Sequence, residues 1–156
     1  MIQKIVSGGQ TGVDRAALDM ALEIGIPCGG WCPRGRRAED GTIPPQYPLQ
    51  ETDSRSYNKR TKLNVQDSDA TLVLNLGELE GGTAYTVQVA EKIGKPYLIV
   101  ALDGSTDPGS VAAWLNEQGV QVLNVAGPKE SKRPGIYDES LRFLLVVLKL
   151  ACHHAA

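Results

Sequence analysis

Short apolar, β-branched runs alternate with helical patterns along this chain of 156 residues. The apolar runs show no polar alternation, which is typical of strands buried on both faces of a sheet. Strands are predicted at residues 4–6, 28–31, 70–75, 97–101 and 120–125, and helices at 14–24, 57–66, 84–93, 108–118 and 136–150. Buried strands separated by helices favour a parallel sheet covered on both sides. The expected fold class is therefore α/β, with a doubly wound, mostly parallel sheet in a three-layer α/β/α arrangement.

Residues 32–56 interrupt this pattern, because they show no sustained periodicity and contain four prolines. A loop of that length inside a compact domain is usually functional or partly disordered. We find neither a repeat nor a linker, so residues 1–150 are predicted to form one ligand-binding domain and residues 151–156 a C-terminal tail. In that tail His153 and His154 stand next to Cys152, and we interpret them as a frayed end rather than as metal ligands.

Composition restricts the class of protein. With 16 Lys and Arg against 18 Asp and Glu, the formal net charge is −2, which argues against a dedicated duplex nucleic-acid binder. No apolar run approaches the length of a membrane span, and the N-terminus lacks the pattern of a signal peptide. The 3 cysteines form no C-x-x-C motif, which favours a reducing cytoplasm over a disulfide scaffold or a zinc site. We expect no metal site; Asp67, Ser68 and Asp69 are better explained as a turn.

The charge is unevenly distributed along the chain. Residues 31–62 carry a net charge of +3 and the remainder carries −5. The segment includes Arg34, Arg36 and Arg37, and guanidinium groups bind phosphate and carboxylate in a bidentate manner. A solvated cluster, partly neutralised by Glu39 and Asp40, is the alternative. If the cluster lies beside the predicted ligand loops, the molecule is polarised in a way that suits a small anion.

A glycine-rich loop joins the first predicted strand to the first helix. It consists of Ser7, Gly8, Gly9, Gln10, Thr11 and Gly12. Glycines allow close backbone approach, and a helix start offers free N–H donors to an anion. The loop is not a dinucleotide fingerprint, because Ser7 stands where the first glycine is needed, and it is not a Walker A loop, because Val13 and Asp14 follow Gly12. A tight turn with Asp14 as a helix-start carboxylate is the alternative.

Two more loops follow predicted strands, at the end of a parallel sheet where ligands bind. Gly81, Gly82 and Thr83 begin a helix and offer backbone donors and a hydroxyl group, although Thr83 could serve only as an N-cap. The loop after the last strand combines Asn124, Gly127 and Ser131 with three cations; an ordinary solvated loop is equally compatible with it.

These segments together resemble the molybdenum cofactor carrier family. The resemblance rests on residues 7–15, 29–41, 81–83 and 124–131, and on Asn64 with residues 67–69, and it extends over essentially the whole chain. That family belongs to a Rossmann-like superfamily that includes the lysine-decarboxylase-like, Lonely Guy phosphoribohydrolases. The resemblance implies a cytoplasmic homotetramer that holds molybdenum cofactor noncovalently, with molybdoenzymes as candidate partners.

The implied ligand is a pterin with a phosphate and an oxo-molybdenum group. The phosphate would bind N–H donors of residues 8–12 or 81–83, and the pterin would bind amides such as Gln10 or Asn124. Because a carrier must release its ligand, we expect hydrogen bonds rather than a Cys–Mo bond from Cys28 or Cys32. The candidate binding residues are Ser7, Gly8, Gly9, Gln10, Thr11, Gly12, Arg15, Arg34, Arg36, Arg37, Gly81, Gly82, Thr83, Asn124, Gly127 and Ser131.

An enzyme is the alternative, acting on a nucleoside monophosphate. In the related phosphoribohydrolases a catalytic glutamate stands three residues after the threonine of the second glycine motif, and Thr86 occupies that position here. Without that carboxylate a glycosidic bond lacks its obvious acid or base, although Glu80 or Glu39 could substitute for it. A nucleotide-sensing module without catalysis is a third possibility, because fold analogy alone does not exclude it.

Overall fold

A five-stranded parallel sheet forms the centre of the computed structural model, which describes residues 1–154. Across the sheet the strands follow the order β2-β1-β9-β7-β8. Their bounds are β1 (Lys4–Val6), β2 (Cys28–Gly29), β7 (Ala70–Asn75), β8 (Tyr97–Ala101) and β9 (Val122–Ala126). Every residue of β7 is buried, as its continuous apolar sequence predicts. The molecule is thus a Rossmann-like α/β fold, which confirms the expected class.

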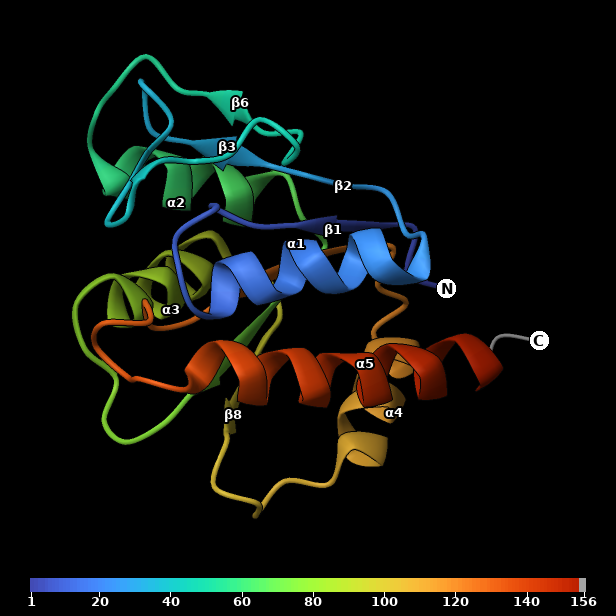
Figure 1. Cartoon of the computed structure of the whole chain (residues 1–156). Helices are drawn as coiled ribbons and strands as arrows, with labels where there is room; N and C mark the ends of the chain where they lie inside the picture. The colour runs from blue at the N-terminus through green and yellow to red at the C-terminus, as the bar shows by residue number, and fades with distance from the viewer. Residues whose placement is uncertain (155–156) are drawn as a thin grey trace.

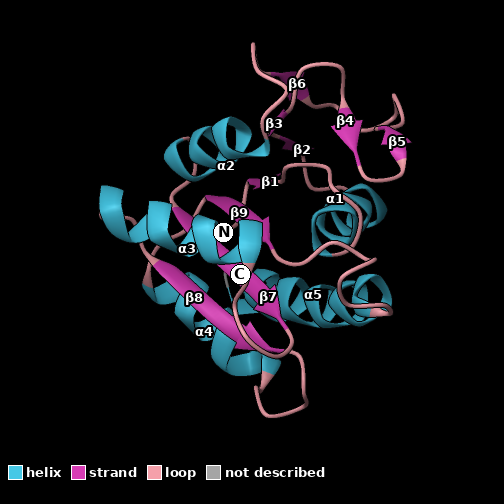
Figure 2. Ribbon diagram, turned by 90° about the vertical axis from the view of Figure 1, so that its left-hand side faces the viewer, coloured by secondary structure: helices cyan, strands magenta, loops and turns pink. Residues whose placement is uncertain are grey.

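The strands can be renumbered along the chain from β7, so that β7, β8 and β9 are strands 1, 2 and 3 and β1 and β2 are strands 4 and 5. With this numbering their order across the sheet is 2-1-3-4-5. This is a common order of doubly wound sheets. Here the chain is opened between α5 and β1, and the start of β1 and the end of α5 lie on the same side of the molecule (Figures 1 and 2). The strand order reverses between β7 and β9, because β7 continues toward β8 while β9 continues toward β1. Ligands of open α/β sheets bind at such a switch point.

Helices cover both faces of the sheet. Helix α5 packs against α1 and α4, and α2 packs against α3 (Figure 2). Their bounds are α1 (Val13–Ile24), α2 (Tyr57–Gln66), α3 (Gly81–Ile93), α4 (Pro108–Glu117) and α5 (Ile136–His154). Gly25 and Gly94 end α1 and α3 in the left-handed conformation that suits glycine. None of the helices in the described part of the chain is long and apolar enough to span a membrane.

Two helices extend by more than one residue beyond their predicted bounds. Helix α3 begins at Gly81, so the glycine motif forms its first turn, and the N-cap position belongs to Glu80 rather than to Thr83. Helix α5 continues to His154, so the predicted tail begins inside a helix. The side chains of His153 and His154, together with residues 155–156, lie outside what the structure describes.

The segment from residue 31 to residue 56 folds into an ordered cap above β2 and α2 (Figure 1). Strand β3 (Trp31–Cys32) pairs with β6 (Gln50–Glu51), and β4 (Arg37–Ala38) pairs with β5 (Gly41–Thr42). The cap forms a small apolar core with Leu18 of α1, and its own members are Cys32, Ala38, Ile43, Tyr47 and Leu49. The sequence predicted a loop here because irregular backbone places these side chains inward without a repeating period.

The predicted strand at residues 28–31 is divided in two by Gly30. This residue has φ 127°, and a Cβ there would lie 2.4 Å from the carbonyl oxygen of Ser7. The chain therefore leaves the main sheet after Gly29 and enters the cap at Trp31.

Candidate functional site

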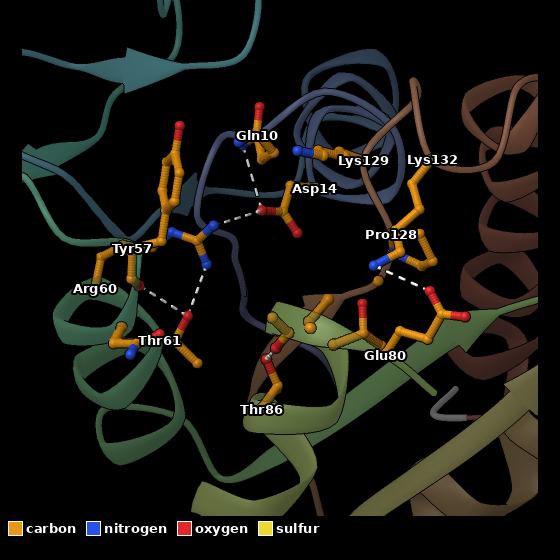
Figure 3. Close-up of a pocket in the computed structure, with 16 residues that line it drawn as sticks. Gln10, Asp14, Tyr57, Arg60, Thr61, Glu80, Thr86, Pro128, Lys129 and Lys132 are labelled. Carbon is orange, nitrogen blue, oxygen red and sulfur yellow. Dashed lines mark hydrogen bonds and ion pairs between the residues drawn. The ribbon is translucent and has the colours of Figure 1, made fainter. Parts of the chain in front are cut away.

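A pocket of about 240 Å³ lies at the switch point between β7 and β9. Figure 3 shows side chains from the start of α1, from α2, from the start of α3 and from the loop after β9 gathered around it. The lining residues are Gln10, Asp14, Tyr57, Asn58, Arg60, Thr61, Glu80, Gly81, Gly82, Thr83, Thr86, Ala126, Gly127, Pro128, Lys129 and Lys132. Four elements that are distant in sequence therefore meet in one cavity.

The first turn of α3 presents its backbone to this pocket. A Cβ at Gly82 would meet no atom within 4 Å, so the N-terminal end of the helix is open at this residue. The first N–H groups of a helix have no partner within the helix, and together with the helix dipole they attract anions. Thr83 and Thr86 are buried beside this turn, and the Thr86 hydroxyl donates to the Gly82 carbonyl at 2.9 Å. The turn is suited to a compact anion.

Cationic side chains also line the pocket, and one of them, Lys132, lies beside the α3 turn. Lys129 and Lys132 come from the loop after β9, and Arg60 comes from α2. Lys132 Nζ lies 3.1 Å from Glu80 Oε2, and Arg133 Nη2 lies 3.7 Å from Glu80 Oε1. The hydrogen bond and charge of Lys132, followed by the charge of Arg133, lower the pKa of Glu80, so this carboxylate stays ionised.

A second carboxyl group, Asp14, is buried in the pocket wall with 4% of its surface exposed. Its Oδ2 accepts the Gln10 N–H at 3.3 Å and lies 3.8 Å from Arg60 Nη2. Burial raises the pKa of Asp14 to about 6, although Arg60 and the Gln10 N–H act in the opposite direction. This group therefore changes its charge close to physiological pH.

Arg60 occupies space that only a glycine leaves free. A Cβ at Gly8 would lie 2.7 Å from the Arg60 Cζ, so the guanidinium group rests directly on the loop backbone. Its Nη1 donates to Thr61 Oγ1 at 2.8 Å, whereas its buried Nε has no hydrogen-bond partner among the described residues. Gly8 thus positions the arginine that faces Asp14 across the pocket (Figure 3).

Five of the candidate residues from the sequence line the pocket: Gln10, Gly81, Gly82, Thr83 and Gly127. Gly127 is required by packing, because a Cβ there would lie 2.2 Å from the Leu74 carbonyl oxygen. The remaining candidates are not among the residues that line the pocket.

The other residues of the first glycine loop pack against neighbouring protein segments and do not line the pocket. Ser7 Oγ donates to the Asp14 carbonyl at 2.9 Å. A Cβ at Gly9 would lie 2.5 Å from Leu49 Cδ1, and a Cβ at Gly12 would lie 2.4 Å from the Pro128 carbonyl oxygen. Thr11 Oγ1 donates to Glu39 and accepts the Glu130 N–H. The loop thus packs against the cap and against the loop after β9.

The predicted arginines mostly hold the cap together. Arg36 donates to the carbonyl groups of Ile43, Pro44, Tyr47 and Leu49. Arg15 donates to the Gly9 carbonyl and to Asp40. Arg37 donates to the Arg55 carbonyl and lies 4.6 Å from the centre of the Tyr57 ring, while Arg34 is exposed. Of the basic residues in the segment 31–62, Arg60 is the one that lines the pocket.

Asn124 and Ser131 also have structural partners. Asn124 is buried, and its Nδ2 lies 3.2 Å from Thr71 Oγ1 on the neighbouring strand. Ser131 donates to Glu39 through both its N–H and its hydroxyl group. These bonds to Glu39 join the cap to the loop after β9.

Sequence reasoning missed Arg60, Tyr57 and Thr61 as site residues. A signal was available, because residues 57, 60, 61 and 64 share one face of a helix at spacings of three and four. The fourth, Asn64, holds the cap through two hydrogen bonds to the Trp31 backbone, at 2.7 and 3.0 Å. Asp14 was expected only as a helix-start carboxylate, and Lys129 and Lys132 only as loop cations.

The chemistry of the pocket is that of anion recognition. It offers backbone N–H groups, hydroxyl groups, two ammonium groups and a guanidinium group. Among the described side chains, no group of three or more His, Cys, Asp or Glu is arranged to hold a metal ion. Burial raises the pKa of both the Cys28 and the Cys32 thiols, and neither residue lines this pocket.

Comparisons with known proteins agree with this architecture. Residues 5–148 match the family described as the circularly permutated YpsA SLOG family, whose name fits the opened strand order. A crystal structure of a "putative molybdenum carrier protein" from Syntrophus aciditrophicus SB is similar at 48% sequence identity and a TM-score of 0.90, covering 94% of this chain and 95% of that one. No similar sequence was found among curated proteins. The family match spans most of the chain, which therefore belongs to the circularly permutated YpsA SLOG family.

Proposed function

We propose that this protein binds molybdenum cofactor noncovalently in the pocket between β7 and β9, and so carries or stores it. The observation that supports this proposal is the convergence of the open α3 N-terminus with Lys129, Lys132 and Arg60 in a single cavity. The relative from Syntrophus aciditrophicus, whose name refers to a molybdenum carrier, is 48% identical over almost its whole length.

Each part of the cofactor has a chemically suitable partner in the pocket. Its phosphate would bind the N–H groups of the Gly81–Gly82 turn with Lys132, because that site combines donors with positive charge. Its oxo groups would accept from Arg60 and the Thr83 hydroxyl, because the Thr61 and Thr86 hydroxyls donate to backbone carbonyls. The amide nitrogen of Gln10 would serve the pterin, since its Oε1 accepts the N–H groups of Thr11 and Glu39. No cysteine is among the lining residues, so release requires only the breaking of hydrogen bonds and ionic contacts.

The test is anaerobic binding of purified molybdenum cofactor to the full chain, with AMP and GMP as competitors. Replacement of Arg60 by Gln is expected to weaken cofactor binding roughly 10–100-fold, as expected for the loss of a charged hydrogen-bonding group. Arg34→Gln is the matched control, because its side chain is exposed and does not line the pocket. Tight nucleotide binding without uptake of the cofactor would contradict the carrier function.

A nucleoside monophosphate is the second candidate ligand, because the same phosphate site would accept it. Of the two carboxylates considered as catalytic substitutes, Glu39 is bound to Thr11 and Ser131 outside the pocket, and Glu80 is paired with Lys132 and Arg133. Asp14, whose pKa is raised to about 6, is better poised for acid–base catalysis than either of them. Release of free base from AMP or GMP, lost in Asp14→Asn, would favour an enzyme over a carrier.

The homotetramer, the cytoplasmic location and the molybdoenzyme partners remain predictions from the resemblance. Light scattering on the purified chain tests the first, and transfer of bound cofactor to an apo-molybdoenzyme tests the last.

A further inference from the structure

The pocket contains a buried carboxyl group, Asp14, among its cationic side chains. Asp14 is almost fully buried in the wall, so its carboxyl group meets any ligand anion at close range. A permanently ionised carboxylate at this position would repel the ligand that the lysines and Arg60 attract. The side chain must therefore be neutralised or compensated when an anion binds.

Arg60 is the cation that Asp14 and a ligand would share. The separation of 3.8 Å between Arg60 Nη2 and Asp14 Oδ2 is too long for a hydrogen bond, so their attraction is purely electrostatic. With Nη1 on Thr61 and Nε without a described partner, the hydrogen-bonding capacity of the guanidinium group is incompletely used. The guanidinium group therefore keeps N–H donors for an oxyanion.

The other charged groups around Asp14 cannot replace Arg60 as its partner. Arg15, the next residue on α1, donates to the Gly9 carbonyl and to Asp40. On the loop after β9, Lys132 is paired with Glu80, and Lys129 lines the pocket but is not among the groups that shift the pKa of Asp14. The remaining neighbours are the phenol of Tyr57 on α2, the hydroxyls of Thr61, Thr83 and Thr86, and the Gln10 N–H.

We propose that the pocket is a proton-linked oxyanion site, in which a bound phosphate- or sulfate-type group takes Arg60 from Asp14 and the Asp14 carboxylate takes up one proton from solvent. The step forms one O–H bond on Asp14 and breaks no covalent bond of the protein or the ligand. It rests on the proposed function in one respect, namely that the ligand is an anion and binds in this pocket.

The two carboxyl groups of the pocket differ in the way this mechanism requires. Glu80 has 47% of its side chain exposed and two cationic partners, and its lowered pKa keeps it charged. Asp14 is buried, with Arg60 at 3.8 Å and a weaker influence from Arg15, and its pKa of about 6 places it near the point of protonation before any ligand arrives. A bound anion adds negative charge beside Asp14 and raises this pKa further. By linkage, the affinity for the anion rises as pH falls toward about 6 and is constant below it.

Inorganic sulfate is the probe, because it does not itself titrate near neutral pH. Sulfate affinity is measured calorimetrically at about pH 8 and about pH 5.5 for the wild type, Asp14→Asn and the control Asp40→Asn, whose carboxylate pairs with Arg15 outside the pocket. We expect the wild type and the control to bind sulfate roughly tenfold more tightly at the lower pH, for a rise of one unit in the Asp14 pKa. Asp14→Asn should bind equally at both pH values, and at pH 8 at least as tightly as the wild type.

A direct measurement keeps the inference testable if Asp14→Asn folds poorly. Carboxyl NMR of the wild type follows the titration of Asp14 with and without sulfate, and the pKa should rise when sulfate is present. An unchanged pKa, a flat wild-type profile, or no sulfate binding at either pH would overturn the inference. His153 and His154 are present in all three proteins, so a pH dependence caused by them would remain in Asp14→Asn.

The outcomes separate this inference from the carrier function. Cofactor uptake together with a pH-independent sulfate affinity would overturn only the proton linkage. A proton-linked sulfate site that does not take up molybdenum cofactor would overturn only the choice of ligand.

Discussion

The two glycine loops at the ends of β1 and β7 look alike in sequence and differ in purpose. In the loop after β1, a Cβ on Gly9 or Gly12 would lie within 2.5 Å of a neighbouring side chain or carbonyl oxygen. In the turn that begins α3, a Cβ on Gly82 would meet nothing. Glycine serves close packing in the first loop and leaves open space in the second, where we propose that the ligand binds.

The difference arises from what lies above each strand end. The cap covers the loop after β1, and its residues Ile43 and Leu49 pack on Gly9. The turn after β7 adjoins the switch point, where the chain diverges in two directions and leaves a cavity. A glycine motif therefore indicates close approach by some group, and only the surrounding structure tells whether that group is protein or ligand.

The largest expected effect is the loss of stability in Gly12→Ala. Gly12 has φ 79° and faces the Pro128 carbonyl oxygen, so left-handed strain and overpacking together should cost roughly 2–5 kcal/mol of unfolding free energy. Gly25→Ala is the matched control, because Gly25 has φ 78° with open space around it and carries the strain alone. Denaturant unfolding measures both variants, and equal losses would mean that the first loop is not held by packing.

The next effect concerns the arginine that holds the cap. Arg36→Met should lower the unfolding free energy by roughly 2–4 kcal/mol, because carbonyl groups of the cap lose their donor. Arg34→Met, which changes an exposed side chain, should stay within about 0.5 kcal/mol. Sulfate binding should be retained by folded Arg36→Met. If Arg36→Met is as stable as the wild type but binds sulfate more weakly, Arg36 contributes to ligand binding rather than to the cap.

A smaller effect is expected from Asp14, which is bonded to the first glycine loop and lines the pocket. Its folded pKa of about 6 lies above its ordinary value, so its contribution to stability is complete below about pH 4 and is lost as pH rises through about 6. Replacement by Asn removes this loss. The variant should gain up to roughly 3 kcal/mol relative to the wild type between pH 4 and pH 7.5. Unfolding at both pH values measures the gain, and parallel profiles would contradict the raised pKa.

The smallest effect, that of Gly82→Val, tests the difference between the two glycine loops most directly. Gly82→Val should weaken sulfate and cofactor binding roughly tenfold, about 1.4 kcal/mol, because the side chain projects into the open end of α3. Its unfolding free energy should change by less than about 1 kcal/mol, since nothing is displaced. Gly82→Ala should show a smaller loss of affinity. If Gly82→Val unfolds the protein while binding persists, the second loop is also a packing element.

Local pattern was sufficient for most of the secondary structure. The strands at 4–6, 70–75 and 97–101 and the helix at 57–66 have the bounds that periodicity predicted. These elements contain continuous apolar runs or a face with a fixed period, so neighbouring residues carry the information. The edge strand at 97–101 was expected to be buried, but only Val100 of it is, because no further strand of the described residues covers its outer side. The α/β class follows from their alternation, and the resemblance over the whole chain agrees with the family match.

The cap could not be predicted in this way. Its core joins Leu18 of α1 to Ile43, Tyr47 and Leu49, which have no common period and meet only through long-range contacts. The choice among the arginines was undecidable for the same reason. Arg36 and Arg60 have the same chemistry, yet one meets cap carbonyls and the other lines the pocket.

The sequence by itself determined the elements, the fold class and the placement of glycine loops at the ends of strands, because each depends on residues close together in the chain. Tertiary structure decided the strand order, the position of the pocket between β7 and β9, and the juxtaposition of Asp14 with Arg60. All three features depend on which strands become neighbours, and the spacing of apolar residues along the chain does not determine that pairing.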